Sequence, residues 1–250
     1  MNETITILTN HRSVREFIPE KDVTEAQVEV IIKAALAAPN WANGQQVSVI
    51  EVRDAEKKST LAKAAGNQRW IEEAPVFLVF CIDFYRAMKA AEKNGTELRI
   101  VEDLEALMVG STDVGIALGS AVIAAESMGL GTVPIGGIRR NPQTFVDQLN
   151  LPKYVFPVSG LVLGHPRTIP DQKPRLPLQA THHKEQYHAE IQREVMDQYD
   201  DSFSAYMSER TNGKDTSNWS SKIARFYDNG FEEYEKNASP TIKKQGFRYK

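Results

Sequence analysis

The chain has 250 residues, 41% of them hydrophobic, and its formal charge of −3 balances 30 Lys and Arg against 33 Asp and Glu. This apolar content is enough for a substantial buried core, built as one large domain or two small ones. A protein that follows a nucleic acid backbone normally carries a basic excess, so the charge balance disfavours nucleic acid as the main partner.

Cysteine usage and the apolar stretches indicate the compartment. The lone Cys81 excludes a disulfide framework within the chain and fits a reducing environment. The start, "MNETITILTN", has no basic region followed by an apolar run, so no signal peptide is expected. The longest apolar stretch, 104–125, is interrupted by Glu105 and Asp113, which favours a buried helix over a membrane span. We therefore expect a cytoplasmic protein without a membrane partner.

The first half of the chain alternates helical and strand patterns. Thr24 followed by Gln27 is a capping-box pattern, and the helix that it starts should end at Pro39. A loop is predicted over 37–45, and a strand over 47–52. A helix follows over 55–65 and ends at Gly66, and 76–83 is predicted to be a central strand covered on both faces.

The strongest helical pattern covers 102–128 and is dense in small residues. One side of this helix is predicted to carry Leu104, Leu107, Met108, Ser111, Gly115, Leu118, Val122 and Ala125. Small side chains let another backbone approach closely. The helix is therefore either an ordinary core helix or part of a subunit interface.

The rest of the chain changes character after residue 165. "GTVPIGGI" at 131–138 predicts a short strand and a loop, Asn141 and Pro142 start a helix to about Leu149, and 155–166 is a buried strand. We expect residues 1–165 to form an α+β core. Residues 166–250 form an extended segment and a helical arm of the same single domain, which wraps its own core or a second subunit.

Near the start of the chain, "HRSVREF" gathers His11, Arg12 and Arg15 around Ser13. Phosphate recognition needs several N–H donors converging on one anion, and arginine supplies a rigid fork of them. In a helix or turn, His11 and Arg15 would share a face. The alternative is an ordinary set of surface ion pairs.

Two further patterns add to the basic cluster. In "QKPRLP", Lys173 and Arg175 flank a proline that keeps the chain extended, so both side chains should point to one side. In "VPIGGIRR", Gly136 and Gly137 would let backbone N–H groups approach a planar ligand. Each has a plain alternative, a solvated linker and an ordinary turn. The G-x-G-x-x-G spacing of a dinucleotide-binding fold is missing.

Taken together, these patterns resemble the nitroreductase superfamily, in its NfsA and flavin reductase P branch, which includes Firmicute NAD(P)H-dependent FMN reductases and nitroreductases. The resemblance spans essentially the whole chain. It is carried by "HRSVREF", "APNWANGQQ", "GNQRWIEEAPVFLVFCIDF", "ESMGLGTVPIGGIRRNP", "LPKYVFPVSGLVLGHP", "KPRLP" and "RTNGKDTSNWS". It implies an α+β fold around a mixed central sheet flanked by helices, and an intertwined homodimer with one FMN in each of two interface pockets.

The resemblance also implies the roles of individual residues. The N-terminal segment would bind FMN, Lys173 and Arg175 would join the phosphate site, Gln68 would contact the ring edge, and Glu105 would belong to the flavin hydrogen-bond network. The backbone of the 134–137 loop would reach the ring. The implied cofactor residues are His11, Arg12, Ser13, Arg15, Asn40, Asn43, Gln68, Glu105, Pro134, Ile135, Gly136, Gly137, Lys173 and Arg175.

The chain departs from the family pattern at one place. Relatives often carry Ser-Ser where this sequence has Asn40 and Trp41. Asn40 can still hydrogen-bond a ribityl or phosphate group, whereas the bulkier Trp41 lines the pocket or lies on the dimer surface. The departure concerns the shape of the pocket and therefore the substrate preference.

The implied activity is that of an FMN-dependent NAD(P)H oxidoreductase acting on free flavin, nitroaromatic compounds or quinones by ping-pong kinetics. FMN, bound tightly without a covalent bond, carries the chemistry, so no catalytic side chain is needed. Arg15 would stabilise the reduced ring near N1 and O2, and the amide of Gly136 or Gly137 would hold N5 and O4. Arg210 and Lys214 would bind the 2′-phosphate of NADPH, or else belong to a mobile surface loop, with NADH as the other possible donor.

Three alternatives complete the sequence reading. A non-catalytic flavin-binding or flavin-delivery protein would keep the phosphate site without turnover. A phosphoryl-binding regulatory module would use the basic cluster without flavin. A metal site in "THHKEQYH" is disfavoured, because His183 and His188 are five residues apart instead of four.

Overall fold

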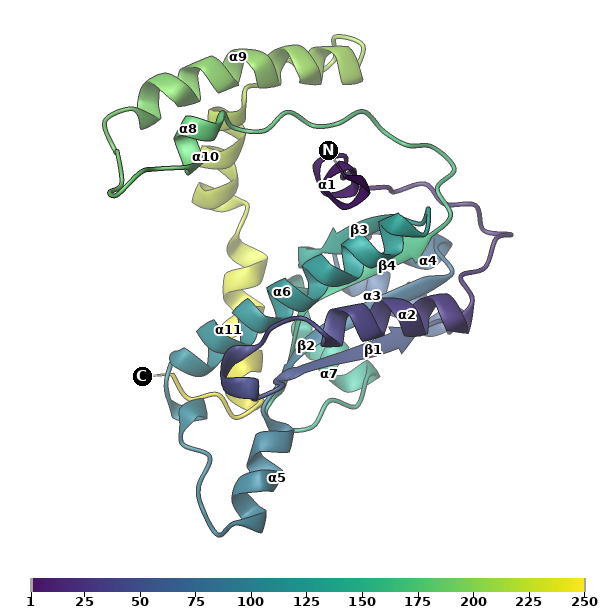
Figure 1. Ribbon diagram of the computed structural model, residues 1–250, viewed down its shortest axis with the longest axis vertical. Coiled ribbons are helices and arrows are strands. Elements are labelled where there is room, and N and C mark those ends of the chain that lie inside the picture. Colours follow the sequence, from purple (N-terminus) through teal and green to yellow (C-terminus); the bar gives the residue numbers. More distant parts are fainter. Residues whose placement is uncertain (1, 250) are drawn as a thin grey trace. The chain divides into compact units, whose positions relative to one another are not determined.

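The computed structural model describes residues 2–249, and their contacts divide the chain into two compact units. The first comprises the residues up to Pro170 together with those from Glu233 onward, and the second is Asp171–Glu232. The helices and strands (Figure 1) are α1 (Glu3–Thr9), α2 (Glu25–Leu36), η1 (Trp41–Asn43), β1 (Val47–Val52), α3 (Ala55–Ala64), α4 (Arg69–Glu73), β2 (Val76–Asp83), α5 (Tyr85–Lys93), η2 (Ile100–Glu102), α6 (Glu105–Ser127), β3 (Gly131–Ile135), η3 (Gly136–Arg140), α7 (Pro142–Gln148), β4 (Val155–Gly164), α8 (Leu178–Thr181), α9 (Gln192–Arg210), α10 (Trp219–Asn229) and α11 (Glu232–Lys244).

The first unit is built on one sheet with the strand order β1-β2-β4-β3. The three pairings between these strands are antiparallel. Among the described residues, the parallel component of the sheet is one isolated bridge, between Ser13 and Thr132. The predicted α+β fold around a sheet flanked by helices is confirmed.

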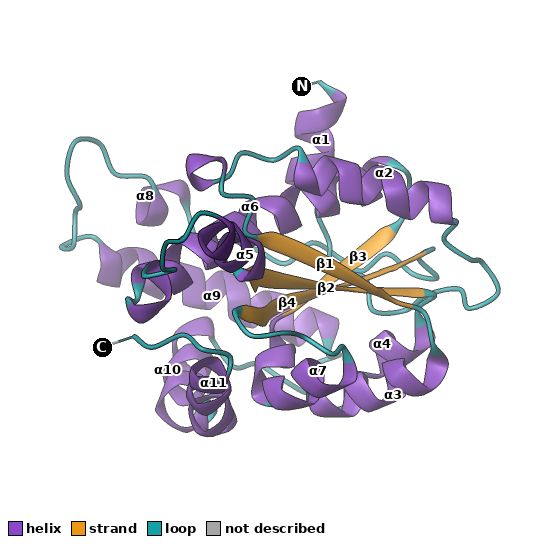
Figure 2. Cartoon of the chain, turned by 90° about the horizontal axis from the view of Figure 1, so that it is seen from below, coloured by secondary structure: helices purple, strands orange, loops and turns teal. Residues whose placement is uncertain are grey.

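Strand β2 lies inside the sheet, and all eight of its residues are buried. Because side chains alternate along a strand, Leu78, Phe80 and Ile82 belong to the core cluster that contains α2 and α6 residues, whereas Phe77 and Val79 belong to the cluster with α3 and α7. Figure 2 shows these helices on opposite faces of the sheet. The prediction of a central strand covered on both faces is therefore confirmed.

The buried side of helix α6 overlaps only at Ala125 with the side that the sequence pattern listed. Its buried residues are Ala106, Val109, Gly110, Asp113, Val114, Ala117, Ala121 and Ala125. Of the side predicted from the pattern, Leu104 and Met108 are 51% and 59% exposed. The helix is apolar on both sides, so periodicity alone cannot tell which side meets the sheet. On the same side, Leu107, Leu118 and Val122 are partly buried against the core, and Ala125 is fully buried. This side is therefore part core and part surface, and its role in a subunit interface stays a prediction.

Helix α6 is also, among residues 2–249, the one helix long and apolar enough by length and composition to cross a membrane. It contacts α2, β1, β2, β3 and β4, as a core helix does.

Local capping follows the sequence closely. Thr24 and Gln27 form the predicted capping box at the start of α2. Gly66, which follows the C-cap of α3, has a φ of 92°, a value that glycine adopts without strain. Asn141 precedes Pro142 at the first position of α7, although the Asn141 side chain makes no capping hydrogen bond.

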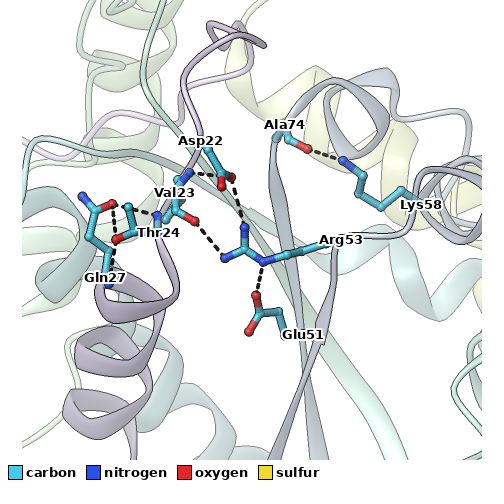
Figure 3. A network of polar contacts seen from close by, with 8 residues as sticks. All are labelled: Asp22, Val23, Thr24, Gln27, Glu51, Arg53, Lys58 and Ala74. Carbon is cyan, nitrogen blue, oxygen red and sulfur yellow. Dashed lines mark hydrogen bonds and ion pairs between the residues drawn. The ribbon is translucent and has the colours of Figure 1, made fainter.

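Polar contacts tie the start of α2 to the sheet (Figure 3). Arg53, directly after β1, donates from Nη1 to an Asp22 oxygen at 3.0 Å and from Nη2 to the Val23 carbonyl at 2.8 Å. On the other face of the sheet, the buried Lys58 ammonium donates to the Ala74 carbonyl, and burial lowers its pKa. These contacts fix the connections around β1 and lie outside the predicted site.

The second unit has a small aromatic core of its own. The ring centroid of Tyr199 lies 6.0 Å from that of Phe203 and 5.7 Å from that of Trp219. The Tyr199 hydroxyl donates to the Pro174 carbonyl at 2.8 Å, which joins the extended segment to α9. Both Tyr199 and Phe203 are buried.

Candidate functional site

The basic N-terminal segment lies along the edge strand of the sheet. The Val14 N–H donates to the Thr132 carbonyl at 2.8 Å, next to the parallel bridge between Ser13 and Thr132. Val14 is 4% exposed and packs into the core, which anchors the segment. Helix α1 ends at Thr9, and residues 11–17 are not helical. The helix considered for this segment is therefore not formed, because the segment pairs with a strand instead. That His11 and Arg15 act on one ligand stays a prediction.

A carboxylate from α6 holds His11. Glu126 Oε1 accepts from His11 Nδ1 at 2.7 Å and from the Thr132 hydroxyl at 2.7 Å. The His11 and Glu126 side chains are 28% and 16% exposed, and Thr132 is fully buried. The carboxylate acceptor places a proton on Nδ1, which leaves Nε2 as the ring nitrogen for a ligand.

The arginines of the segment have local partners that orient them. The Arg15 guanidinium carbon lies 5.4 Å from the centroid of the Trp70 ring, within the range of a cation–π contact. Arg12 donates to the Asn10 carbonyl at 2.8 Å. The Trp70 Nε1 atom is buried and has no hydrogen-bond partner among residues 2–249.

The glycine pair after β3 packs beside Gln68. A Cβ atom on Gly137 would lie 2.3 Å from Gln68 Nε2 and 2.5 Å from the Ala65 carbonyl oxygen, so no side chain fits there. A Cβ on Gly136 would meet nothing closer than Arg139 Nη2 at 3.6 Å. Gly137 is thus explained by its approach to protein atoms, while the backbone at Gly136 stays open to a ligand.

Asn40 and Asn43 lie in a loop after α2 that contacts α6 at Asp113. The loop is held by Asp113 of α6, whose two carboxylate oxygens each lie 3.2 Å from the Trp41 nitrogen and accept its N–H. Asn40 Oδ1 accepts the Gln45 N–H at 3.0 Å. The Trp41 side chain is 55% exposed.

Glu105 is exposed in the first turn of α6. It lies 21 residues before Glu126 in the chain, which corresponds to about 30 Å along the helix axis. Within one chain the predicted cofactor residues of the first unit therefore form two groups. We name them the His11 group (His11, Arg12, Ser13, Arg15, Gln68 and Pro134–Gly137) and the Asn40 group (Asn40, Asn43 and Glu105).

The remaining predicted residues belong to the second unit. Arg175 donates to the Lys173 carbonyl at 3.1 Å in a segment without regular structure. Arg210 is in the last turn of α9 and donates to the Tyr206 hydroxyl at 3.4 Å, and Lys214 follows in an exposed turn. The pairing of these residues with the first unit stays a prediction.

The turn that carries Lys214 is ordered by its own side chains. Asp215 accepts from Lys222 Nζ at 2.6 Å and from the Ser217 N–H at 2.9 Å, and these partners hold the pKa of its carboxyl well below the ordinary range. Thr211 Oγ1 accepts the Asp215 N–H at 2.8 Å. These contacts argue against a mobile surface loop. Among residues 2–249, no group of three or more His, Cys, Asp or Glu side chains could hold a metal ion.

Sequence reasoning missed the residues that hold the site. Asp113 and Glu126 look isolated in the sequence because their partners, Trp41 and His11, are 72 and 115 residues away. The one usable signal is that three acidic residues, Glu105, Asp113 and Glu126, interrupt an otherwise apolar helix.

Family models match nearly the whole chain. The model of the nitroreductase family matches residues 8–165, and the model of the nitroreductase family C-terminal domain matches residues 173–250. This chain belongs to the nitroreductase family.

Individual members of the nitroreductase family agree with this assignment over their full length. The chain is 49% identical over 251 aligned positions to a protein of Bacillus subtilis (strain 168) named FMN reductase (NAD(P)H), covering 99% of each. Its fold matches the structure of B. megaterium NfrA2 with a TM-score of 0.96 at 46% identity, covering 100% of both chains. It also matches NADPH:FMN oxidoreductase from Vibrio harveyi complexed with NAD+, with a TM-score of 0.85 at 33% identity and 100% coverage of both.

Proposed function

We propose that this chain is an FMN-dependent NAD(P)H oxidoreductase that passes electrons to free flavin, nitroaromatic compounds or quinones. The observation that carries the proposal is the His11 group. A segment with two arginines, a histidine and a serine runs along β3, and β3 leads into the open backbone of Gly136. This is a phosphate-binding donor set beside a place where a flat ring can approach the backbone.

The residues present fit FMN. Arg12 and Arg15 supply charged donors for the phosphate, and a hydrogen bond to such a group contributes about 1.5–3 kcal/mol. The buried Trp70 Nε1, beside Arg15, still lacks an acceptor among the described residues. Bound FMN supplies the hydride transfer from the nicotinamide and to the acceptor. The chain itself binds and orients it, and needs no side-chain nucleophile.

The first test is an anaerobic titration of the purified protein with NADPH and then NADH, followed by visible absorbance. A yellow protein that bleaches, and regains its colour when nitrofurazone or free FMN is added, is expected. A yellow protein that never bleaches would replace the oxidoreductase with the flavin-delivery alternative. A colourless protein that takes up no added FMN would refute the role of the His11 group.

For the nicotinamide, we propose that Arg210 and Lys214 bind the 2′-phosphate of NADPH. They lie at the end of α9 and in the turn that Asp215 orders. Arg210→Ala should raise KM for NADPH more than KM for NADH, because only NADPH carries the extra phosphate. Equal increases for the two donors would contradict this role.

We further propose that the chain works as a homodimer in the cytoplasm, in which the Asn40 group of one subunit completes the cofactor site that the His11 group of the other begins. The separation of the two groups along α6 supports this arrangement. So does the apolar outer side of α6, where a Cβ on Gly115 or Gly119 would meet nothing within 4 Å. With Ile7 and Leu8 of α1, this side lines an apolar groove that a second subunit would cover.

A further inference from the structure

The loop that carries Asn40 and Asn43 has a strained backbone. Ala42, Asn43 and Gln45 have φ values of 51°, 53° and 50°, in the left-handed region that non-glycine residues rarely adopt. For Ala42 and Gln45 this conformation is unfavourable, whereas Asn43 tolerates it better. A conformation of this kind persists only where neighbouring groups hold it, and strained segments of this kind cluster at functional sites.

Side chains from α6 and α5, and one from the loop itself, hold this loop. Asp113 of α6 accepts the Trp41 N–H with both carboxylate oxygens. Arg86 of α5 donates from Nη2 to the Gln45 carbonyl at 2.6 Å and is itself fixed by Asp83 at 2.7 Å. Together with the Asn40 contact to the Gln45 N–H, these bonds fix the loop at both ends.

Burying the charged carboxylate of Asp113 at this position is energetically unfavourable. The residue is 3% exposed, and among residues 2–249 the one hydrogen-bond donor recorded for its carboxylate is the Trp41 amide. Burial raises the pKa of its carboxyl, as expected where the charged form is disfavoured. It also lines a cavity of about 300 Å³ together with Asn40, Gln45 and Arg86, so the loop has space on one side and is not wedged by packing.

We propose that Asp113 is a positioning residue for the reaction: by binding the Trp41 amide, it holds the strained Asn40–Gln45 loop in the shape that presents Asn40 and Asn43 to the cofactor. This role rests on the proposed function. It differs from a general structural role, because losing Asp113 should loosen one loop and weaken cofactor binding while the rest of the first unit stays folded.

Two variant pairs test the contact from both sides. Asp113→Ala removes the acceptor, and Asp113→Asn keeps an uncharged one. Trp41→Pro removes the N–H donor, and Trp41→Ala removes the same side chain but keeps the donor. Proline is compatible here, since Trp41 is the first residue of η1 and Asn40 before it has φ −139° and ψ 156°. Thr112→Ala, which removes a hydroxyl bonded to the Met108 carbonyl of the same helix, is the control.

Two measurements report the outcome, amide hydrogen exchange of residues 38–46 in the apoprotein and the Kd for FMN. Asp113→Ala should speed the exchange and raise Kd about tenfold or more, since a hydrogen bond to a charged group is lost. Asp113→Asn should fall between this variant and the parent, because an uncharged acceptor bonds more weakly. Trp41→Pro should behave like Asp113→Ala, while Trp41→Ala should keep slow exchange and Thr112→Ala should match the parent in both.

Unchanged exchange in Asp113→Ala, or faster exchange with an unchanged Kd for FMN, would overturn the proposal. If Asp113→Ala does not fold, the comparison of Trp41→Pro with Trp41→Ala decides, and equal exchange in those two would overturn it as well. A parent protein that binds no FMN would instead refute the proposed function. The exchange measurement on the apoprotein would still report on the contact itself.

Discussion

The two ends of helix α6 hold their neighbouring segments in different ways. Near Ser127, the His11 segment is paired to β3 through backbone atoms, and Glu126 adds a side-chain contact. At Asp113, nearer the other end, the Asn40–Gln45 loop has a strained backbone and depends on the side chains of Asp113 and Arg86. Backbone pairing tolerates side-chain substitution, whereas a loop held by side chains does not. The loop is therefore the part of the candidate site whose shape should be most sensitive to a single side-chain substitution.

The largest expected effect is the loss of FMN, which tests whether the His11 group and the Asn40 group form one site. Arg15→Ala and Asn43→Ala should each lose FMN on dialysis as homodimers. Mixed dimers of the two variants should retain about half of the parental FMN per dimer, because one composite site then has both native groups. Dimers carrying two different affinity tags isolate the mixed species for measurement. No recovery in the mixed dimer would mean that both groups serve the cofactor of their own chain.

The glycine pair provides a matched comparison at the His11 end. Gly137→Ala should lower the free energy of unfolding by roughly 1–3 kcal/mol, since the new methyl group overlaps the Ala65 carbonyl oxygen and Gln68. Gly136→Ala has room for its methyl group and should fold like the parent. Urea unfolding of both variants checks this, and equal losses would contradict the close packing at Gly137.

A smaller effect is expected from the ring that stacks on Arg15. Trp70→Leu keeps an apolar side chain but removes the cation–π partner of Arg15. Because Arg15 is exposed, this contact contributes about 0.5–1 kcal/mol. The Kd for FMN should rise a few-fold, clearly less than in Arg15→Ala. Fluorescence titration of the apoprotein measures both. A larger loss in Trp70→Leu than in Arg15→Ala would show that the ring has a role of its own.

The smallest effect concerns the charge of Asp113. Because burial raises the pKa of this carboxyl, the folded state holds the proton more tightly than the unfolded state. The parent then gains stability from this group as the pH falls through the folded pKa, and loses it as the pH rises. Asp113→Asn should therefore raise the urea midpoint at pH 7, and the difference should vanish at about pH 3, where the carboxyl is protonated in both states. A urea midpoint of Asp113→Asn below that of the parent at pH 7 would contradict this prediction.

The sequence was sufficient for the four strands and for α2, α3, α6 and α7, whereas α1, α4 and α5 were not predicted. The apolar run of β2, the capping box of α2 and the stop at Gly66 are local patterns, and all three are confirmed. The side of α6 that meets the sheet was not predicted, because a helix that is apolar on both sides gives no directional signal. The holding contacts of Asp113 and Glu126 could not be predicted, since only the folded chain brings their partners close. Which residues touch the cofactor stays a prediction.

The position of Cys81 has a consequence for a protein that handles reduced flavin in the presence of air. It is the one cysteine of the chain, it is fully buried in β2, and burial raises the pKa of its thiol. Since the thiolate is the nucleophile that reacts with peroxide, a buried neutral thiol is resistant to it. Peroxide released at the site would find no ready sulfhydryl to convert to sulfenic acid. Storage without a reducing agent should therefore leave activity intact for as long as the fold stays closed.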